Sequence, residues 1–327
     1  MSTRQNGGHT HQRKDPRRSG NPARRAASDH RVELGESARI TWRDWVGAAR
    51  LRTLPLALAP IAAAAGIALS VRSFSLTLTL LALAVAVLLQ IGVNYANDYS
   101  DGIRGTDAHR VGPARLTASG LVPPKRVLIT ALVFFGLAAV AGIAAVLISE
   151  RWWFLAIGAV AIIAAWFYTG GKRPYGYLGL GELFVFIFFG LVATVGTVWL
   201  QSDIVPQEAW FAGAGVGLFA VATLIANNVR DIPTDCLAGK RTLAVLIGDR
   251  ASRVLYCICM IVPFGFFAVF GLFYPGLVFG WLVLALALPA CVIMVMAKTP
   301  RELILVLKLT SFTGLAYGIA LGAGIGF

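Results

Sequence analysis

The sequence predicts an all-α membrane protein: a bundle of nine transmembrane helices with a cap of cytoplasmic loops over one end. Of its 327 residues, 57% are apolar, and the mean hydropathy is +0.72. Soluble domains are about 45–50% apolar even when glycine is counted. Nine apolar runs approach or reach the length of about 20 residues that a membrane helix needs. The chain is therefore expected to form one polytopic domain over residues 36–327.

The first 35 residues form a separate region. Residues 1–35 are rich in Arg, Ser, Gly, Asn and His and contain almost no large apolar side chains. Such a segment buries too little surface to offset its ordering entropy, so a disordered, basic cytoplasmic tail is predicted. No apolar segment follows a short basic start, which argues against a signal peptide. The arginines of the tail could also contact anionic lipid or nucleic acid.

The membrane domain opens with an interfacial helix and continues into the spans. Residues 40–51 place Trp42 and Trp45 on one side, as a short helix lying at the headgroup level does. Glycines within the spans, including Gly136, Gly190 and Gly213, indicate close helix packing. The predicted spans cover approximately residues 54–71, 75–97, 126–148, 152–169, 178–200, 209–229, 254–274, 277–297 and 307–326.

The placement of basic residues predicts the orientation in the cell membrane. With nine spans and the tail inside, 27 of the 29 Lys and Arg residues lie in or beside inside segments, and only Arg72 and Arg151 lie outside. By the positive-inside rule, the N-terminus is cytoplasmic and the C-terminus is outside. This distribution explains the net charge of +13 without a nucleic-acid partner. Because the inside loops are long and the outside ones short, the active site is expected to face the cytoplasm.

Two acidic stretches carry the same spacing of polar residues. On a helix, Asn94, Asn97, Asp98 and Asp101 would fall on one face, at i, i+3, i+4 and i+7. The pattern Asn94/Asn97/Asp101/Gly105 recurs as Asn228/Asp231/Asp235/Gly239. Two acidic helix ends that face one cavity would bind a divalent metal and a polyanion.

The chemistry of these acids favours magnesium. Carboxylates at a membrane edge repel one another and need a positive partner. Oxygen ligands suit Mg²⁺, which is commonly held by a few carboxylates together with substrate phosphates. The alternative, acids that cap helix ends in water, does not explain the repeated spacing. The four histidines lie in the tail or a loop and the four cysteines lack metal spacing, so zinc is not predicted.

Basic and aromatic residues accompany the acids. Arg104 and Arg115 follow the first stretch, and Arg230 and Lys240 flank the second. Their side chains could bind the remaining charge of a diphosphate, although positive-inside placement alone would supply some of them. The third inside loop holds Tyr168 and Lys172 in an aromatic setting, which is either the floor of a pocket for a flat ring or a turn with interfacial tyrosines.

The two acidic motifs resemble those of the UbiA superfamily of membrane prenyltransferases. The motifs are Asn97-Asp98-Tyr-Ser-Asp101 and Asp231-Ile-Pro-Thr-Asp235, and the resemblance covers roughly residues 40–326. Further motifs are similar to the branch that prenylates 1,4-dihydroxy-2-naphthoate in menaquinone synthesis. These are Asp98-x-x-Asp101-Gly-x-x-Gly105-x-Asp107, Gly112-Pro113-x-Arg115-Leu116 and Thr234-Asp235-x-x-x-Gly239-Lys240. The chain has Gly105 where the family pattern has a third acid.

The resemblance implies a Mg²⁺-dependent transfer of a polyprenyl group from polyprenyl diphosphate to 1,4-dihydroxy-2-naphthoate, with decarboxylation. Arg115, Lys172 and Lys240 would stabilise the departing diphosphate, and the bundle would hold the isoprenoid. The implied metal ligands, also catalytic together with Lys240, are Asp98, Asp101, Asp231 and Asp235. The implied substrate-binding residues are Asn94, Asn97, Arg104, Asp107, Arg115, Tyr168, Lys172, Asn228 and Arg230.

Other functions remain open at this point. The same fold could use 4-hydroxybenzoate, homogentisate or a phosphoribosyl donor. A cation-coupled transporter would also carry internal repeats and intramembrane acids. The acids here gather at one face rather than at the midplane, which weighs against transport.

Overall fold

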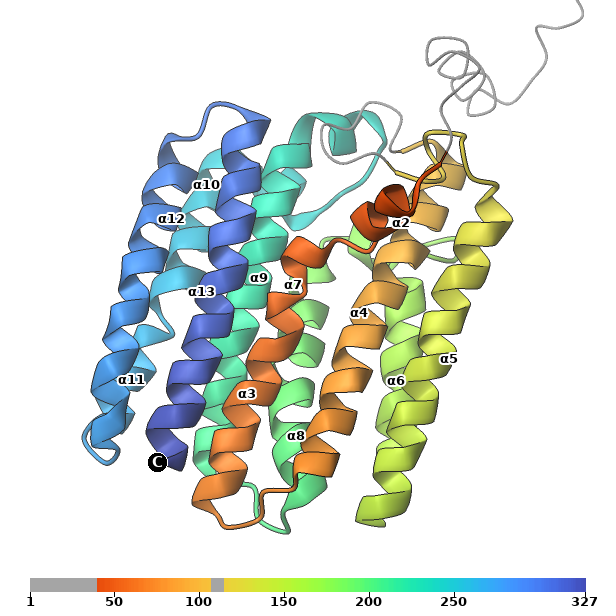
Figure 1. Ribbon diagram of the computed structural model, residues 1–327. Coiled ribbons are helices and arrows are strands. Elements are labelled where there is room, and N and C mark those ends of the chain that lie inside the picture. Colours follow the sequence, from red (N-terminus) through yellow and green to blue (C-terminus); the bar gives the residue numbers. More distant parts are fainter. Residues whose placement is uncertain (1–39, 107–114) are drawn as a thin grey trace, which may run out of the picture.

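The computed structural model describes residues 40–106 and 115–327, and this part of the chain folds entirely into helices and their connections (Figure 1). The predicted all-α class is confirmed. The tail over residues 1–35 and Asp107 lie outside the described residues. In chain order the elements are α2 (Trp42–Ala48), η2 (Leu51–Thr53), α3 (Pro55–Ser70), α4 (Leu76–Arg104), α5 (Pro124–Ser149), α6 (Phe154–Phe167), η3 (Tyr175–Tyr177), α7 (Gly181–Val185), η4 (Phe186–Val192), α8 (Ala193–Gln201), α9 (Gln207–Leu237), α10 (Leu243–Ile261), α11 (Phe264–Phe270), η5 (Pro275–Val283), α12 (Leu284–Met296) and α13 (Pro300–Gly326).

Seven helices in the described ranges are long and apolar enough to cross a membrane, or eight if one bent pair counts as a span. The bent pair joins Trp42–Thr53 to Pro55–Ser70 at 46°. The remaining predicted span corresponds to α6, which has 14 residues and a length of about 21 Å, shorter than a typical hydrocarbon core. A multi-pass membrane protein is confirmed, and the count of nine spans is not.

The helices that carry the acidic motifs are longer than predicted. The second and sixth spans were expected to end at residues 97 and 229, but α4 runs to Arg104 and α9 to Leu237. Helix α10 begins at Leu243, eleven residues before the predicted seventh span. These boundaries correct the expectation of long inside loops over 98–125 and 230–253. Hydropathy falls where a helix leaves the lipid, whereas the helix itself continues until its backbone is capped.

Helices α4 and α9 end in the same capping motif. The carbonyl of Asp101 accepts a hydrogen bond from the Thr106 amide at 3.2 Å, and that of Asp235 accepts one from the Lys240 amide at 2.9 Å. The glycines before these amides have left-handed backbones, with φ of 73° at Gly105 and 71° at Gly239, as the Schellman motif requires. The repeated Asp-x-x-x-Gly spacing is therefore a repeated helix ending, which sets one aspartate on the last turn of each helix.

Close glycine packing fixes α9 against the π-helical turn η4. A Cβ atom at Gly190 would lie 2.5 Å from both the Gly213 carbonyl oxygen and the Gly217 Cα. The predicted close approach is confirmed there. At Gly136 it is wrong, because an added Cβ would meet no atom within 4 Å.

The two ends of the bundle differ in character. Helix α2 lies at the end where α4 and α9 carry their aspartates, and the C-terminus lies at the opposite end (Figure 1). We call the first of these the acidic end. Helix α2 is shorter than the predicted 40–51 segment, and its Trp42 side chain is exposed.

Candidate active site

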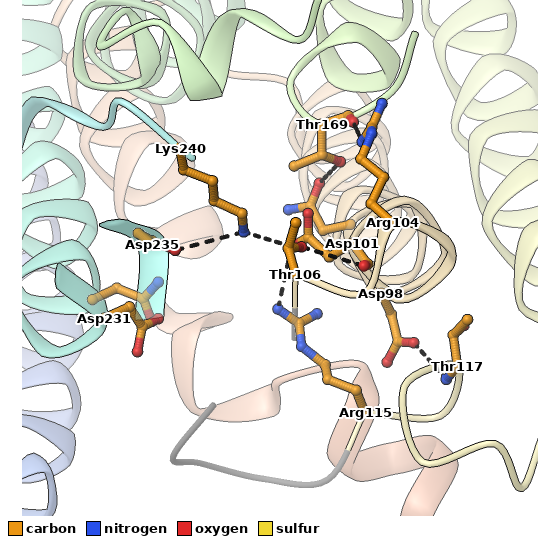
Figure 2. A network of polar contacts seen from close by, with 12 residues as sticks. Asp98, Asp101, Arg104, Thr106, Arg115, Thr117, Thr169, Asp231, Asp235 and Lys240 are labelled. Atoms are coloured by element: carbon orange, nitrogen blue, oxygen red, sulfur yellow. Dashed lines mark hydrogen bonds and ion pairs between the residues drawn. The ribbon is translucent and has the colours of Figure 1, made fainter. Parts of the chain in front are cut away.

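Lys240 links the two acidic motifs at the acidic end. Its Nζ lies 3.5 Å from Asp101 Oδ2 and 3.6 Å from Asp235 Oδ1, and all three side chains are at most 10% exposed (Figure 2). The Tyr177 hydroxyl donates a hydrogen bond to Asp101 Oδ1. The Lys240 ammonium group also lies 4.8 Å from the centre of the Tyr177 ring. One buried cation is thus shared between an aspartate of α4 and an aspartate of α9.

These residues face a polar pocket with an open volume of about 610 Å³. The structure brings together many of the side chains that the sequence predicted for the site. Those that line the pocket are Asn97, Asp101, Arg115, Tyr168, Asn228, Asp231, Asp235 and Lys240. We call this space the acidic pocket.

A second, larger pocket of about 900 Å³ adjoins the first and is called here the arginine pocket. Its walls combine apolar side chains with the arginines Arg50, Arg52, Arg115 and Arg230. The two pockets adjoin because they share wall residues, which are Arg50, Arg115, Leu224 and Asn227. The acidic groups and Lys240 thus line the acidic pocket alone, Arg52 and Arg230 line the arginine pocket alone, and Arg50 and Arg115 line both.

Arg230 binds Asp231, lines the arginine pocket, and has one buried nitrogen that makes no hydrogen bond to described residues. Its Nε and Nη2 donate to the two carboxylate oxygens of Asp231, both at 2.7 Å, and Nη2 also donates to Asn227 Oδ1 at 2.8 Å. The Arg230 Nη1 atom is buried and has no hydrogen-bond partner within the described part of the chain. Because an unsatisfied buried donor is costly, Nη1 is suited to binding an anionic ligand group.

Four of the predicted site residues within ranges 40–106 and 115–327 line neither pocket. Asn94 donates through Nδ2 to the Ala49 carbonyl at 2.9 Å, and Lys172 is exposed. Arg104 donates to the backbone carbonyls of Thr169 and of Gly171 instead of facing the pocket.

Asp98 is the fourth residue outside both pockets. Its oxygens accept hydrogen bonds from the backbone amides of Leu116 at 2.9 Å and Thr117 at 2.8 Å, and its side chain is fully buried (Figure 2). Asn97 and Asp101 point into the pocket, whereas Asn94 and Asp98 do not. The expectation that all four residues would act on one face is therefore corrected: neighbouring helix positions differ by about 100° in direction.

Sequence reasoning missed several wall residues. Tyr177 lies in the aromatic loop that the sequence singled out, but nothing marked it as the partner of Asp101. Burial raises the pKa of Tyr177 and the negative charge of Asp101 raises it further, so the hydroxyl remains a neutral donor. Thr169 donates to Asn97 Oδ1 at 2.7 Å. Arg50, with a left-handed backbone at φ 56°, reaches both pockets because the chain turns inward after α2.

The oxygen groups of the acidic pocket fit magnesium that is completed by a phosphate ligand. Among the residues that the structure places, no three His, Cys, Asp or Glu side chains lie close enough to hold an ion by themselves. Asp101 and Asp235 nevertheless already share one cation, the ammonium group of Lys240. Mg²⁺ is usually bound by one or two carboxylates plus substrate phosphates rather than by an all-protein cage, and the arrangement agrees with that pattern.

Comparison with known sequences finds one family over most of the chain. The model of the UbiA prenyltransferase family matches residues 57–322. A 1,4-dihydroxy-2-naphthoate octaprenyltransferase of Mycobacterium tuberculosis (strain ATCC 25618 / H37Rv) is 45% identical over 287 residues, which are 88% of this chain and 98% of that protein. The enzyme of the same name from Escherichia coli (strain K12) is 39% identical over 250 residues, 74% of this chain and 81% of that protein.

A solved structure has a similar fold. It is a UbiA homolog from Archaeoglobus fulgidus bound to DMAPP and Mg²⁺, with a TM-score of 0.62 and 16% sequence identity. The likeness covers 86% of this chain and 99% of that protein. The prediction of a UbiA-like helical bundle agrees with this fold.

Proposed function

Because the chain belongs to the UbiA prenyltransferase family, we propose that it transfers a polyprenyl group from a polyprenyl diphosphate to 1,4-dihydroxy-2-naphthoate. The reaction releases diphosphate and CO₂ and gives demethylmenaquinol, the reduced form of demethylmenaquinone. The relatives that match most of the chain carry this acceptor in their names. The structural observation that carries the proposal is the pair of joined pockets, one acidic with a central lysine and one lined by arginines.

The diphosphate of the donor occupies the acidic pocket. Asp101, Asp231 and Asp235 would hold Mg²⁺ together with oxygens of the diphosphate, and the ion would supply positive charge that stabilises the diphosphate as a leaving group. Lys240 adds an ammonium group that already lies between the two motifs. Arg115 lies 4.0 Å from Asp101 Oδ2 and lines both pockets, so its guanidinium group is placed to bind the departing diphosphate.

The aromatic acceptor occupies the arginine pocket. A dihydroxynaphthoate is a flat apolar ring with one carboxylate, and the walls offer Phe189, Leu56 and Val185 beside guanidinium groups. The buried Nη1 of Arg230 supplies a donor to that carboxylate, and Arg52 supplies further positive charge. The ring then faces the junction of the two pockets, where carbon–carbon bond formation takes place.

The membrane arrangement follows from the same proposal. The chain crosses the membrane nine times, with α6 as a short span and the bent pair as the first. The acidic end faces the cytoplasm, cytoplasmic loops cap the site, and residues 1–35 form a tail outside the catalytic domain. Positive-inside placement of Lys and Arg supports this orientation, as does the position of the C-terminus at the opposite end of the bundle (Figure 1).

The first experiment measures acceptor choice directly. Purified protein is incubated with labelled geranylgeranyl diphosphate, Mg²⁺ and either 1,4-dihydroxy-2-naphthoate or 4-hydroxybenzoate, and lipid product and CO₂ are followed. Product and CO₂ with the naphthoate alone, lost on chelation of Mg²⁺, are expected. Transfer to the benzoate alone would overturn the acceptor assignment, and transfer to neither would overturn the prenyltransferase proposal.

Two variants test which pocket binds which substrate. Arg52→Gln changes a residue that lines only the arginine pocket and should raise the KM for the naphthoate by about tenfold or more, since a charged hydrogen bond is lost. Lys240→Gln changes the acidic pocket and should act mainly on the prenyl diphosphate. Equal effects of Arg52→Gln on the KM of both substrates would contradict the assignment of one substrate to each pocket.

A further inference from the structure

Helix α4 carries two polar stripes with different partners. Asn97 and Asp101, four residues apart, line the acidic pocket. Gln90, Asn94 and Asp98, also four residues apart, bond to neighbouring segments of the chain instead. Since residues four apart lie above one another on a helix, the second stripe is a continuous line of anchoring groups.

Asp98 anchors the segment that begins at Arg115. Both of its carboxylate oxygens accept backbone amides, from Leu116 and Thr117. One turn later, a Cβ atom at Gly102 would lie 2.4 Å from the Thr117 Cβ, so the segment lies directly on the helix. Leu116 and Val122 are buried in the same apolar cluster as residues of α4. The segment is thus docked by hydrogen bonds at one point and by apolar packing on either side.

The docked segment places Arg115 in the site. Arg115 directly precedes Leu116, its side chain is 8% exposed, and its Nη2 lies 4.0 Å from Asp101 Oδ2. It lines both the acidic and the arginine pocket. The position of this guanidinium group therefore depends on the backbone that Asp98 holds.

The internal repeat supports a separate role for Asp98. When Asp101 and Gly105 are aligned with Asp235 and Gly239, Asn97 matches Asp231, and Asp98 matches Ile232. Ile232 packs against the main apolar core rather than toward the pocket. In each motif, the residues at the positions of Asn97 and Asp101 line the acidic pocket. Asp98 and its equivalent Ile232 instead face neighbouring segments of the chain.

We propose that Asp98 is a positioning residue and not a metal ligand: its carboxylate anchors the amides of Leu116 and Thr117 and so holds Arg115 beside Asp101. Asn94, one turn before Asp98, anchors a second segment in the same way: it donates a hydrogen bond to the Ala49 carbonyl, directly before Arg50. The kinetic part of this inference rests on the proposed prenyl transfer, whereas the anchoring part does not.

The anchoring part is tested by hydrogen–deuterium exchange on metal-free full-length protein. Asp98→Ala should speed exchange in peptides that cover residues 115–122, and Asp98→Asn, which keeps one acceptor oxygen in place, should give an intermediate rate. The exposed control Asp203→Ala should exchange as the wild type does. Unchanged exchange over residues 115–122 in Asp98→Ala would overturn the proposal that Asp98 anchors this segment.

The metal part is tested by Mg²⁺ titration of geranylgeranyl diphosphate binding at equilibrium. Loss of a group that supports a metal typically weakens metal affinity about 10–100-fold, and such a shift is expected for Asp101→Asn. Asp98→Ala should shift the Mg²⁺ midpoint much less than Asp101→Asn does, because Asp98 accepts hydrogen bonds from the Leu116 and Thr117 amides and its loss leaves the metal ligands in place. A shift as large as that of Asp101→Asn would overturn the proposal.

A double-mutant comparison identifies the residue through which Asp98 acts. If Asp98 works through Arg115, kcat/KM in the double variant Asp98→Ala with Arg115→Ala should be no lower than in Arg115→Ala alone. Fully multiplicative losses would overturn the coupling. Absence of prenyl transfer in the wild type would contradict the proposed function. The hydrogen–deuterium exchange result would then still test whether Asp98 anchors the segment at Leu116 and Thr117.

Discussion

Lys240 is the residue on which the two halves of the acidic pocket depend. Its ammonium group is the shared partner of Asp101 and Asp235, and it is placed to bind charge that grows on the leaving diphosphate. Lys240→Gln should lower kcat/KM by about 10²–10³-fold, the usual cost of removing one donor to a developing anion. The measurement is steady-state kinetics on protein that is shown to be folded.

A matched lysine serves as the control for that change. Lys298 is exposed and lines neither pocket, so Lys298→Gln should leave kcat/KM as in the wild type. Equal activity of the two variants would show that Lys240 does not act on the diphosphate.

Tyr177 contributes a neutral donor to the same aspartate. Tyr177→Phe removes the hydroxyl that bonds Asp101 and keeps the ring beneath Lys240, and activity should fall about tenfold, as for the loss of a hydrogen bond to a charged group. Because burial and Asp101 raise the pKa of Tyr177, this group stays protonated through neutral and moderately alkaline pH. The alkaline limb of the pH–rate profile should therefore be the same in both proteins.

The control for Tyr177 is its neighbour Tyr175. The Tyr175 hydroxyl bonds the Ala164 carbonyl at 2.8 Å, away from the aspartates, so Tyr175→Phe should retain activity. If Tyr177→Phe shifted the alkaline limb, the hydroxyl would be titrating during the reaction, contrary to the assignment as a fixed donor.

At the level of residues, the sequence predicted which acids gather but not which way each one points. The repeated spacing identified Asp101 and Asp235, because both are set by the same helix ending. It could not separate Asp98 from Asp101, since the choice depends on contacts with the segment at Leu116, which the spacing of residues on one helix does not report. Tyr177 was missed for the same reason: its partner is supplied by tertiary packing.

At the level of elements, close packing of η4 on α9 holds the floor of the pockets together. Gly190→Ala would place a methyl group 2.5 Å from backbone atoms of α9, and stability should fall by about 1–3 kcal/mol, as overpacking does. Thermal unfolding in detergent measures this change. Gly136→Ala, where space is open, should be neutral or slightly stabilising, because alanine favours helix over glycine by about 1 kcal/mol. Equal melting temperatures of the two variants would contradict the packing argument.

The ends of the helices show why sequence reasoning misplaced these boundaries. Apolar content predicted the cores of α4 and α9 but stopped near residues 97 and 229, where polar side chains begin. The actual ends are marked by Gly105 and Gly239, whose left-handed backbones close the helices. A glycine four residues after each aspartate was visible in the sequence, and its meaning as a C-terminal cap would have extended both helices by about two turns.

At the level of the whole molecule, composition was sufficient for the fold class and insufficient for the exact number of spans. Long apolar runs dictate helices because no water is available to the backbone in lipid. The length of α6 and the bend before α3 depend on packing and loop geometry, which hydropathy does not report. The short helix α6 lies in a segment that the sequence had placed as an ordinary span, and the bend lies where the predicted interfacial helix meets the first span.

The charge balance of the acidic end predicts how the protein responds to loss of metal. Asp101 and Asp235 share Lys240, and Asp231 is held by Arg230, so each of these acids has a cationic partner without Mg²⁺. Chelation should therefore abolish prenyl transfer while the melting temperature of the wild type changes little.

In Lys240→Gln the same two aspartates face each other without that partner, and the metal-free variant should melt at a lower temperature than the metal-free wild type. Added Mg²⁺ should then stabilise the variant more than the wild type, because a ligand that binds only the folded state raises its stability. Thermal unfolding of both proteins with and without Mg²⁺ provides the four melting temperatures to be compared. An equal drop on chelation in both would show that Lys240 does not balance this pair of aspartates.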